Sequence, residues 1–201
     1  MTSISQEIQS VVRQFHAIHR SVLIYYLMKY FGKTKSEIDS QIHKSAIGKY
    51  CYELENGFVA EKWNYKVTTA EERMSKALRV ALEFMGEGEK TFLLFRVVKG
   101  TDANTLLLVQ QDGAISMIQI SYIMRGDEYW TSDKMASKPI PEQFRDSLFR
   151  IAIIEEETDL KKVRKAGYAM FIRFRRDNYN FSKQDVTSVD KDERWDDVPT
   201  E

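Results

Sequence analysis

Apolar residues recur at helical spacing in three stretches near the N-terminus. Residues 4–16 and 20–31 each carry such a stripe, which predicts two amphipathic helices. A third helix begins at Thr34 or Ser36, because either side chain can cap its first turn. Gly32 separates the second helix from the third, and glycine commonly follows the last turn of a helix. The pattern therefore predicts two helices joined by a short turn, preceded by a further helix.

A hairpin follows the third helix. Ile38, Ile42 and Ala46 recur every fourth residue, so that helix has one face toward a core. Asn56 and Gly57 stand between "CYEL" and "FVAE", and this dipeptide is typical of a type I′ turn, which requires positive φ at both central residues. Helix, helix, turn, helix and hairpin, in that order, predict a winged helix-turn-helix domain.

The period of the pattern changes in the second half of the chain. Thr69 and Glu72 have the spacing of a capping box at the start of a long helix. Shorter apolar runs with β-branched residues then predict strands. These runs are residues 91–98, 104–110, 114–123, 148–154 and 168–174, with a short helix at 156–167. We expect an α+β protein, in which the winged helix-turn-helix precedes an α/β domain with a mixed sheet in the order α-β-β-β-β-α-β.

Charge is distributed unevenly, although Lys+Arg and Asp+Glu both number 30. The segment 185–201 is rich in acidic residues and poor in apolar ones, which is typical of disorder. We therefore expect three parts: residues 1–66, the winged helix-turn-helix; residues 67–178, the α+β domain; and residues 179–201, an acidic, disordered tail. No basic segment followed by an apolar one marks a signal peptide, so we expect a cytoplasmic protein with no membrane partner.

Gly32, Lys33 and Thr34 match the end of a phosphate-binding loop, but the rest of that motif is missing. A P-loop needs a glycine five residues before the second glycine, and Leu27 stands there, within a helix. His16 and His19 have no cysteine or third histidine nearby to complete a metal site. We expect neither a metal nor another cofactor.

The third helix of a winged helix-turn-helix enters the major groove, and the preceding turn lies near phosphates. Hydroxyl and lysine side chains are common donors to base edges and phosphates. The candidate DNA-binding residues are Lys33, Lys35, Ser36, Ser40, His43, Lys44, Lys62, Asn64 and Lys66. Glu37 and Asp39 interrupt this basic face, so an alternative is a winged helix that binds a protein instead of DNA.

A second basic surface is expected near the end of the α+β domain, where acidic residues are missing. It consists of Lys161, Lys162, Arg164, Lys165, Arg173 and Arg175. Such a surface suits DNA phosphates or an acidic partner. The acidic tail of the chain itself, folding back, is the alternative occupant.

The α+β domain has the element order of a restriction-endonuclease-like core, which requires an acid and then a (D/E)-x-K motif to bind Mg²⁺ and orient water. Asp112 imitates the first acid, but Gln119 and Ser121 stand where the motif's acid and lysine are required. We therefore expect no enzymatic activity.

With its "HRSVLIYYL" helix and its "KTKSEIDSQIHKSAIGKYCYELENGFVAE" helix and wing, the chain resembles bacterial mobile-element and plasmid proteins of the replication-relaxation type. These have a winged-helix head and a degenerate restriction-endonuclease-like domain. The resemblance implies a non-catalytic protein that binds double-stranded DNA, a transcriptional regulator or a replication accessory of a mobile element. The second domain would then serve a homodimer or a protein partner. The alternative is a protein-interaction module, antitoxin-like or inhibitor-like, whose winged helix does not bind DNA.

Overall fold

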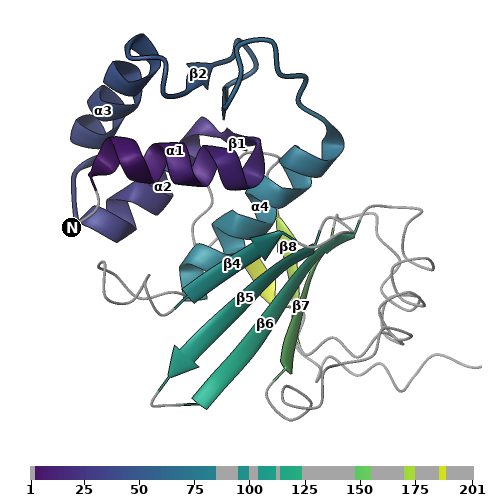
Figure 1. The fold of residues 1–201 in the computed structure, drawn as a ribbon. Coiled ribbons are helices and arrows are strands. Elements are labelled where there is room, and N and C mark those ends of the chain that lie inside the picture. The colour runs from purple at the N-terminus through teal and green to yellow at the C-terminus, as the bar shows by residue number, and fades with distance from the viewer. Residues whose placement is uncertain are drawn as a thin grey trace, which may run out of the picture.

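The computed structural model describes residues 3–84, 95–99, 104–111, 114–123, 148–154, 170–174 and 186–188 (Figure 1). Helices and two separate sheets make this an α+β protein, as the sequence predicts. In the described part of the chain, no helix is both long and apolar enough to cross a membrane.

The three N-terminal helices begin and end close to the predicted residues. They are α1 Ile4–Phe15, α2 Arg20–Phe31 and α3 Lys35–Ile47. Of the two candidate caps for α3, Thr34 is the one used: its side chain accepts the Glu37 N–H, and the Glu37 carboxylate accepts the Thr34 N–H at 2.9 Å. Gly32 ends α2 in the left-handed conformation, and its N–H donates to the Met28 carbonyl oxygen.

A short strand that the sequence pattern does not reveal lies between α1 and α2. This strand, β1 Ala17–His19, pairs antiparallel with β3 Phe58–Ala60, which also pairs with β2 Tyr52–Glu53 on its other side. Three residues are too few to show the alternation that identifies a strand. The predicted hairpin is thus the larger part of a three-stranded sheet with the order β1-β3-β2.

The turn of the hairpin differs from the predicted type I′ turn. Gly57 has a φ of 80°, but Asn56 is not among the described residues with positive φ. The Gly57 N–H donates to the Leu54 carbonyl oxygen at 3.0 Å, which closes a four-residue turn ending in a left-handed glycine. The Asn56 side chain accepts the Phe58 N–H at 3.4 Å, so asparagine contributes a side-chain acceptor here instead of a positive φ.

The long helix α4 Thr69–Phe84 is buried on nearly its whole circumference. Met74, Ala77, Leu78 and Ala81 share one buried face of the helix, and Val80, on the opposite side, is buried too. One side contacts α2 and β1, and the other contacts strands of the larger sheet (Figure 1). One apolar cluster contains residues on both sides of the predicted domain boundary at residues 66 and 67, so the described residues of the two predicted domains share a core.

The cap of α4 lies one residue earlier than predicted. The Thr68 side chain accepts the Ala70 N–H at 3.2 Å, and the Thr68 N–H donates to Glu71 at 2.8 Å. Glu71 also accepts the Tyr65 hydroxyl at 3.0 Å and is buried. Because Glu71 also has Tyr65 as a partner, Glu71 accepts the N–H of the cap residue, which the spacing predicts for Glu72.

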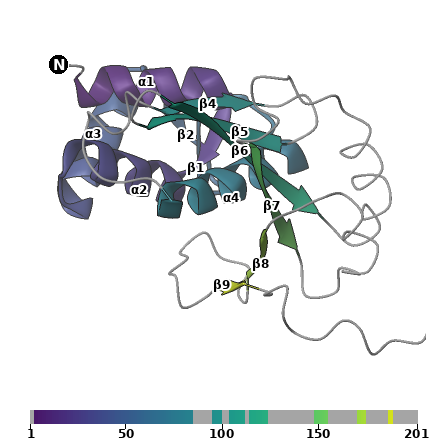
Figure 2. The ribbon, with the colours of Figure 1, turned by 90° about the horizontal axis from the view of Figure 1, so that it is seen from below.

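The larger sheet has six strands in sequence order across it. They are β4 Phe95–Lys99, β5 Asn104–Gln111, β6 Ala114–Ile123, β7 Leu148–Ile154, β8 Met170–Phe174 and β9 Val186–Ser188. The β6–β7 and β7–β8 pairs are parallel and the others antiparallel, so the sheet is mixed as predicted. Figure 2 shows β9 beyond β8, at the far edge from β4.

Alternate residues of the central strands face α4. Ile120 and Tyr122 of β6, Ile151 and Ile153 of β7, and Ile172 of β8 belong to the same apolar cluster as α4. Ser121 and Ile123, on the other face of β6, are also buried. Central strands buried on both faces are typical of parallel pairing.

Strand β9 lies within the segment 179–201 for which the sequence predicts disorder, and its three residues pair with Ile172, Arg173 and Phe174 of β8. Pairing with a sheet edge gives these three residues backbone partners, although the segment has few apolar residues of its own. The acidic tail over 179–201 stays a prediction. The predicted helix at 156–167 lies outside the described residues.

We predict that Gly57→Ala lowers the free energy of unfolding more than Gly32→Ala does. Both glycines are left-handed, but a Cβ at Gly57 would lie 3.3 Å from His19 Nε2, whereas one at Gly32 would meet nothing within 4 Å. We expect a loss of about 1 kcal/mol for Gly32→Ala and about 2 kcal/mol for Gly57→Ala. Urea unfolding followed by circular dichroism measures both, and equal losses would show that the contact with His19 has no effect.

Candidate nucleic-acid interface

The exposed side of α3 carries the residues that the sequence assigns to DNA contact. Ile38, Ile42 and Ser45 are buried, and they define the side of the helix that faces the core. Ala46 is half-buried and packs against the core as predicted, and the Ser45 hydroxyl donates to the Ser5 hydroxyl of α1 at 3.2 Å. The remaining surface of α3 and its leading turn expose Lys33, Lys35, Ser36, Ser40, His43 and Lys44.

The two acids of α3 have partners within the protein. Glu37 completes the capping box with Thr34, and its carboxylate lies 3.9 Å from the Lys33 ammonium. Hydrogen bonds from the Thr34 backbone and hydroxyl lower the pKa of Glu37, so the carboxylate is ionised near neutral pH. Glu37 thus lies at the helix N-terminus, where a negative charge is favourable.

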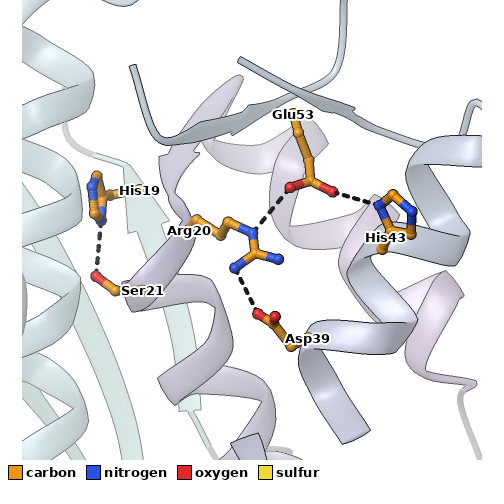
Figure 3. A network of polar contacts seen from close by, with 6 residues as sticks. All are labelled: His19, Arg20, Ser21, Asp39, His43 and Glu53. Atoms are coloured by element: carbon orange, nitrogen blue, oxygen red, sulfur yellow. Dashed lines mark hydrogen bonds and ion pairs between the residues drawn. The ribbon is translucent and has the colours of Figure 1, made fainter. Parts of the chain in front are cut away.

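Arg20 links the start of α2 to both α3 and the hairpin. Its Nη1 lies 2.6 Å from Asp39 Oδ1, and its Nε donates to Glu53 Oε2 at 3.0 Å (Figure 3). Each of these side chains is only partly exposed, between 30% and 40%. We call Arg20, Asp39 and Glu53 the arginine clamp. It neutralises Asp39, so the acid that interrupts the basic face in sequence is paired in the structure.

His43 is exposed, but one of its ring nitrogens faces the hairpin. Its Nδ1 lies 3.5 Å from Glu53 Oε1 (Figure 3). The His43 ring therefore has two competing partners: the DNA predicted from the sequence, and Glu53, through which it connects α3 to β2. Nothing in the spacing of the sequence indicates this pair, because residues 43 and 53 belong to different elements.

The residues predicted to contact DNA beyond the third helix all lie at one end of the hairpin. Lys62, Asn64 and Lys66 are exposed, but they follow β3, at the end away from the turn. Two acids, Glu53 and Glu55, lie at the turn end. The hairpin thus has an acidic tip and a basic base.

The second basic surface can be placed only in part. Arg173 lies on β8, where its partner in the register is Thr187 of β9. Lys161, Lys162, Arg164, Lys165 and Arg175 lie outside the described residues, as does Asp112. Gln119 and Ser121 are buried on β6.

The partial burial and the hydrogen bonds of His19 are not apparent from the sequence. It ends β1, its backbone N–H donates to Ser75 Oγ of α4 at 3.0 Å, and its Nδ1 lies 2.8 Å from Ser21 Oγ. Burial lowers the pKa of His19 from the ordinary 6.5 to about 4. Within the described ranges, no three or more His, Cys, Asp or Glu side chains are grouped to hold a metal ion.

We predict that replacing Arg20 lowers stability more than replacing a cation in a looser pair. Arg20→Met leaves Asp39 and Glu53 without their shared counter-charge, and we expect a loss of about 1 kcal/mol. The control is Lys33→Met, whose partner Glu37 is 3.9 Å away and about half exposed. Equal unfolding midpoints in urea for the two variants would show that the clamp contributes nothing.

We also predict that His19 makes stability depend on pH. Because its folded pKa is lowered to about 4, the unfolded chain binds a proton first as the pH falls below 6.5. Stability is then lost as the pH falls from 6.5 toward 4 and is fully retained above 6.5. His19→Gln should flatten this loss between about pH 7.5 and pH 5 in urea unfolding. His43→Gln, which replaces an exposed ring, is the control and should show the same pH dependence as the wild-type protein. A loss of stability at low pH that persists in His19→Gln contradicts the assignment of this loss to His19.

No family model matches the sequence, and no curated protein or solved structure gives a significant match. The resemblance to replication-relaxation proteins therefore remains a hypothesis, and function has to be argued from the residues described above.

Proposed function

We propose that the protein is a non-catalytic DNA-binding protein whose N-terminal unit works as a winged helix-turn-helix. The order α1-β1-α2-α3-β2-β3, with β3 between β1 and β2, supports this proposal. In such a unit α3 enters the major groove of double-stranded DNA, and the turn before it approaches the phosphates.

The observation that carries the proposal is the polar, acid-free stripe on α3. Ser36, Ser40 and Lys44 are exposed on one side of the helix. The two acids of α3 are engaged elsewhere, Glu37 in the cap and Asp39 in the arginine clamp. The stripe can therefore offer hydroxyl and ammonium donors to base edges. Glu37, which is exposed beside it, is paired with Thr34 and Lys33.

The start of α3 suits a phosphate. Lys33 and Lys35 are exposed on either side of Thr34, the N-cap of the helix, where their ammonium groups can meet phosphates. These contacts would supply affinity and register, and the stripe would supply sequence preference. The resemblance adds the physiological role, that of a regulator or replication accessory of a mobile element. The second domain would contact a second copy or a protein partner.

The acidic tip of the hairpin favours a second candidate function. Glu55 is exposed at the tip and would lie close to DNA if the tip served as a wing, and like charges repel. Glu53, near it in sequence, is held by Arg20. A protein-interaction module, antitoxin-like or inhibitor-like, would instead use this tip against a basic partner.

We predict salt-dependent binding to duplex DNA that depends on lysines of α3. Lys35→Ala and Lys44→Ala should each weaken binding for all sequences and lower the slope of log K against log salt by about 1. The control is Arg13→Ala, which removes an exposed cation from α1, outside α3 and the hairpin. Fluorescence anisotropy with labelled duplexes over a salt series gives both quantities.

Two results would count against the proposal. Absence of duplex binding at low salt would remove it, because the electrostatic contribution is then at its largest. Equal effects of Arg13→Ala and Lys44→Ala would show that α3 is not the contact surface. A stably bound protein, lost on replacement of Glu55, would favour the second candidate.

A further inference from the structure

Two aromatic side chains are exposed at the base of the hairpin. Trp63 is 73% exposed and Tyr50 is 53% exposed, and with Ile47 they are the exposed large hydrophobic residues in the described part of the chain. Burial of aromatic side chains is favourable, so a partner that covers these two exposed rings would gain binding energy. We call Lys49, Tyr50, Lys62 and Trp63 the hairpin-base surface.

The ring of Tyr50 is held in place by the end of α3. Its backbone N–H donates to the Ser45 carbonyl oxygen at 2.9 Å, and Lys49 before it is left-handed with a φ of 60°. A Cβ at Gly48 would lie 2.8 Å from Tyr50 Cε2, so the ring packs directly over the glycine. One face of the ring is thus supported by the protein, and the side chain is still half exposed.

Trp63 projects from a turn that is anchored at its exit. The Tyr65 N–H donates to the Lys62 carbonyl oxygen at 3.2 Å, which leaves Trp63 within the turn. Tyr65 then stacks on His16, with ring centroids 6.3 Å apart, and its hydroxyl donates to the buried Glu71. The turn that presents Trp63 is therefore fixed to both α1 and α4.

The two segments leave the hairpin at the same end. Tyr52 and Ala60 are partners in the register of β2 and β3. Tyr50 stands two residues before Tyr52, and Lys62 stands two residues after Ala60. The rings thus belong to the end of the hairpin opposite its acidic tip.

Lysines accompany both rings, and acids are missing from both segments. Residues 44–52 contain Lys44 and Lys49, and residues 62–66 contain Lys62 and Lys66, with no Asp or Glu in either range. All four lysines are exposed. Exposed aromatic rings among cations are what single-stranded nucleic acid requires, because bases stack on the rings while phosphates meet the charges.

We propose that the hairpin-base surface binds unpaired DNA bases, so that the protein recognises a duplex next to a single strand. The proposal rests on the proposed function for the duplex part, which α3 would contact through Lys44 and the two serines. Tyr50 and Trp63 each stack a base, and Lys49 and Lys62 meet the adjoining phosphates. The partner is single-stranded DNA rather than a protein, because the exposed lysines suit a phosphate backbone. The acids that border the two segments are engaged within the protein, Glu53 by Arg20 and Glu61 by His16.

The test compares three labelled probes: a blunt duplex, the same duplex with a single-stranded thymidine tail, and the tail alone. Fluorescence anisotropy should show the wild-type protein binding the tailed duplex about tenfold more tightly than the blunt one. Trp63→Ala and Tyr50→Ala should each remove most of this ratio, and Trp63→Phe should retain it. Thermal unfolding by circular dichroism verifies that each variant is folded.

Ser36→Ala combined with Ser40→Ala is the matched control, because it alters α3 and leaves the rings in place. It should weaken binding of blunt and tailed duplexes equally. If the blunt duplex does not bind but the tail alone does, through Trp63, the proposed function fails and this inference stands. A ratio near one, or a ratio unchanged in Trp63→Ala, overturns the inference. So does a dimer that Trp63→Ala converts to a monomer, since a second copy then covers the surface.

Discussion

Helix α4 has to bury apolar side chains on nearly its whole circumference, and this requirement joins the two halves of the protein. Ala77, Leu78 and Val80 point in different directions around the helix, and each is fully buried. No single neighbour can cover such a helix. The N-terminal helices cover one side and the six-stranded sheet covers another. The candidate interface on α3 is therefore supported by a core that extends into the second half of the chain.

Polar contacts then set the positions of the elements around this core. The Arg79 guanidinium lies 3.7 Å from the centroid of the Tyr25 ring, and the Tyr25 hydroxyl donates to Glu83 at 2.8 Å, so α2 is held against α4. The arginine clamp in turn connects α2 to α3 and to β2. Partly buried charges of this kind contribute little net stability, but they specify which arrangement of helices is adopted. In this protein they also remove carboxylates from the side of α3 proposed to face DNA.

The helices and most strands could be predicted because their signals are local. Thr34, Gly32 and the spacing of Ile38 and Ile42 mark α3 within a few residues of chain. Strands β5, β6 and β7 have apolar runs long enough to identify, and their bounds agree closely with prediction. Strands β1 and β9 have three residues each, and a partner strand far away in sequence orders them. The hairpin turn and the start of α4 differ from the prediction. The Asn56 side chain accepts the Phe58 N–H in the turn, and Glu71, with Tyr65 as an additional partner, caps α4 together with Thr68.

The sequence by itself determined which residues of α3 are exposed, since helical periodicity alone separates Ser36 and Ser40 from Ile38 and Ile42. Only the tertiary structure decided what those residues can do. It paired Asp39 with Arg20, turned His43 toward Glu53, and placed Lys62 and Trp63 at the base of the hairpin. The physical reason is that charge neutralisation and ring exposure depend on distances between elements, and the spacing of residues within one element does not contain those distances.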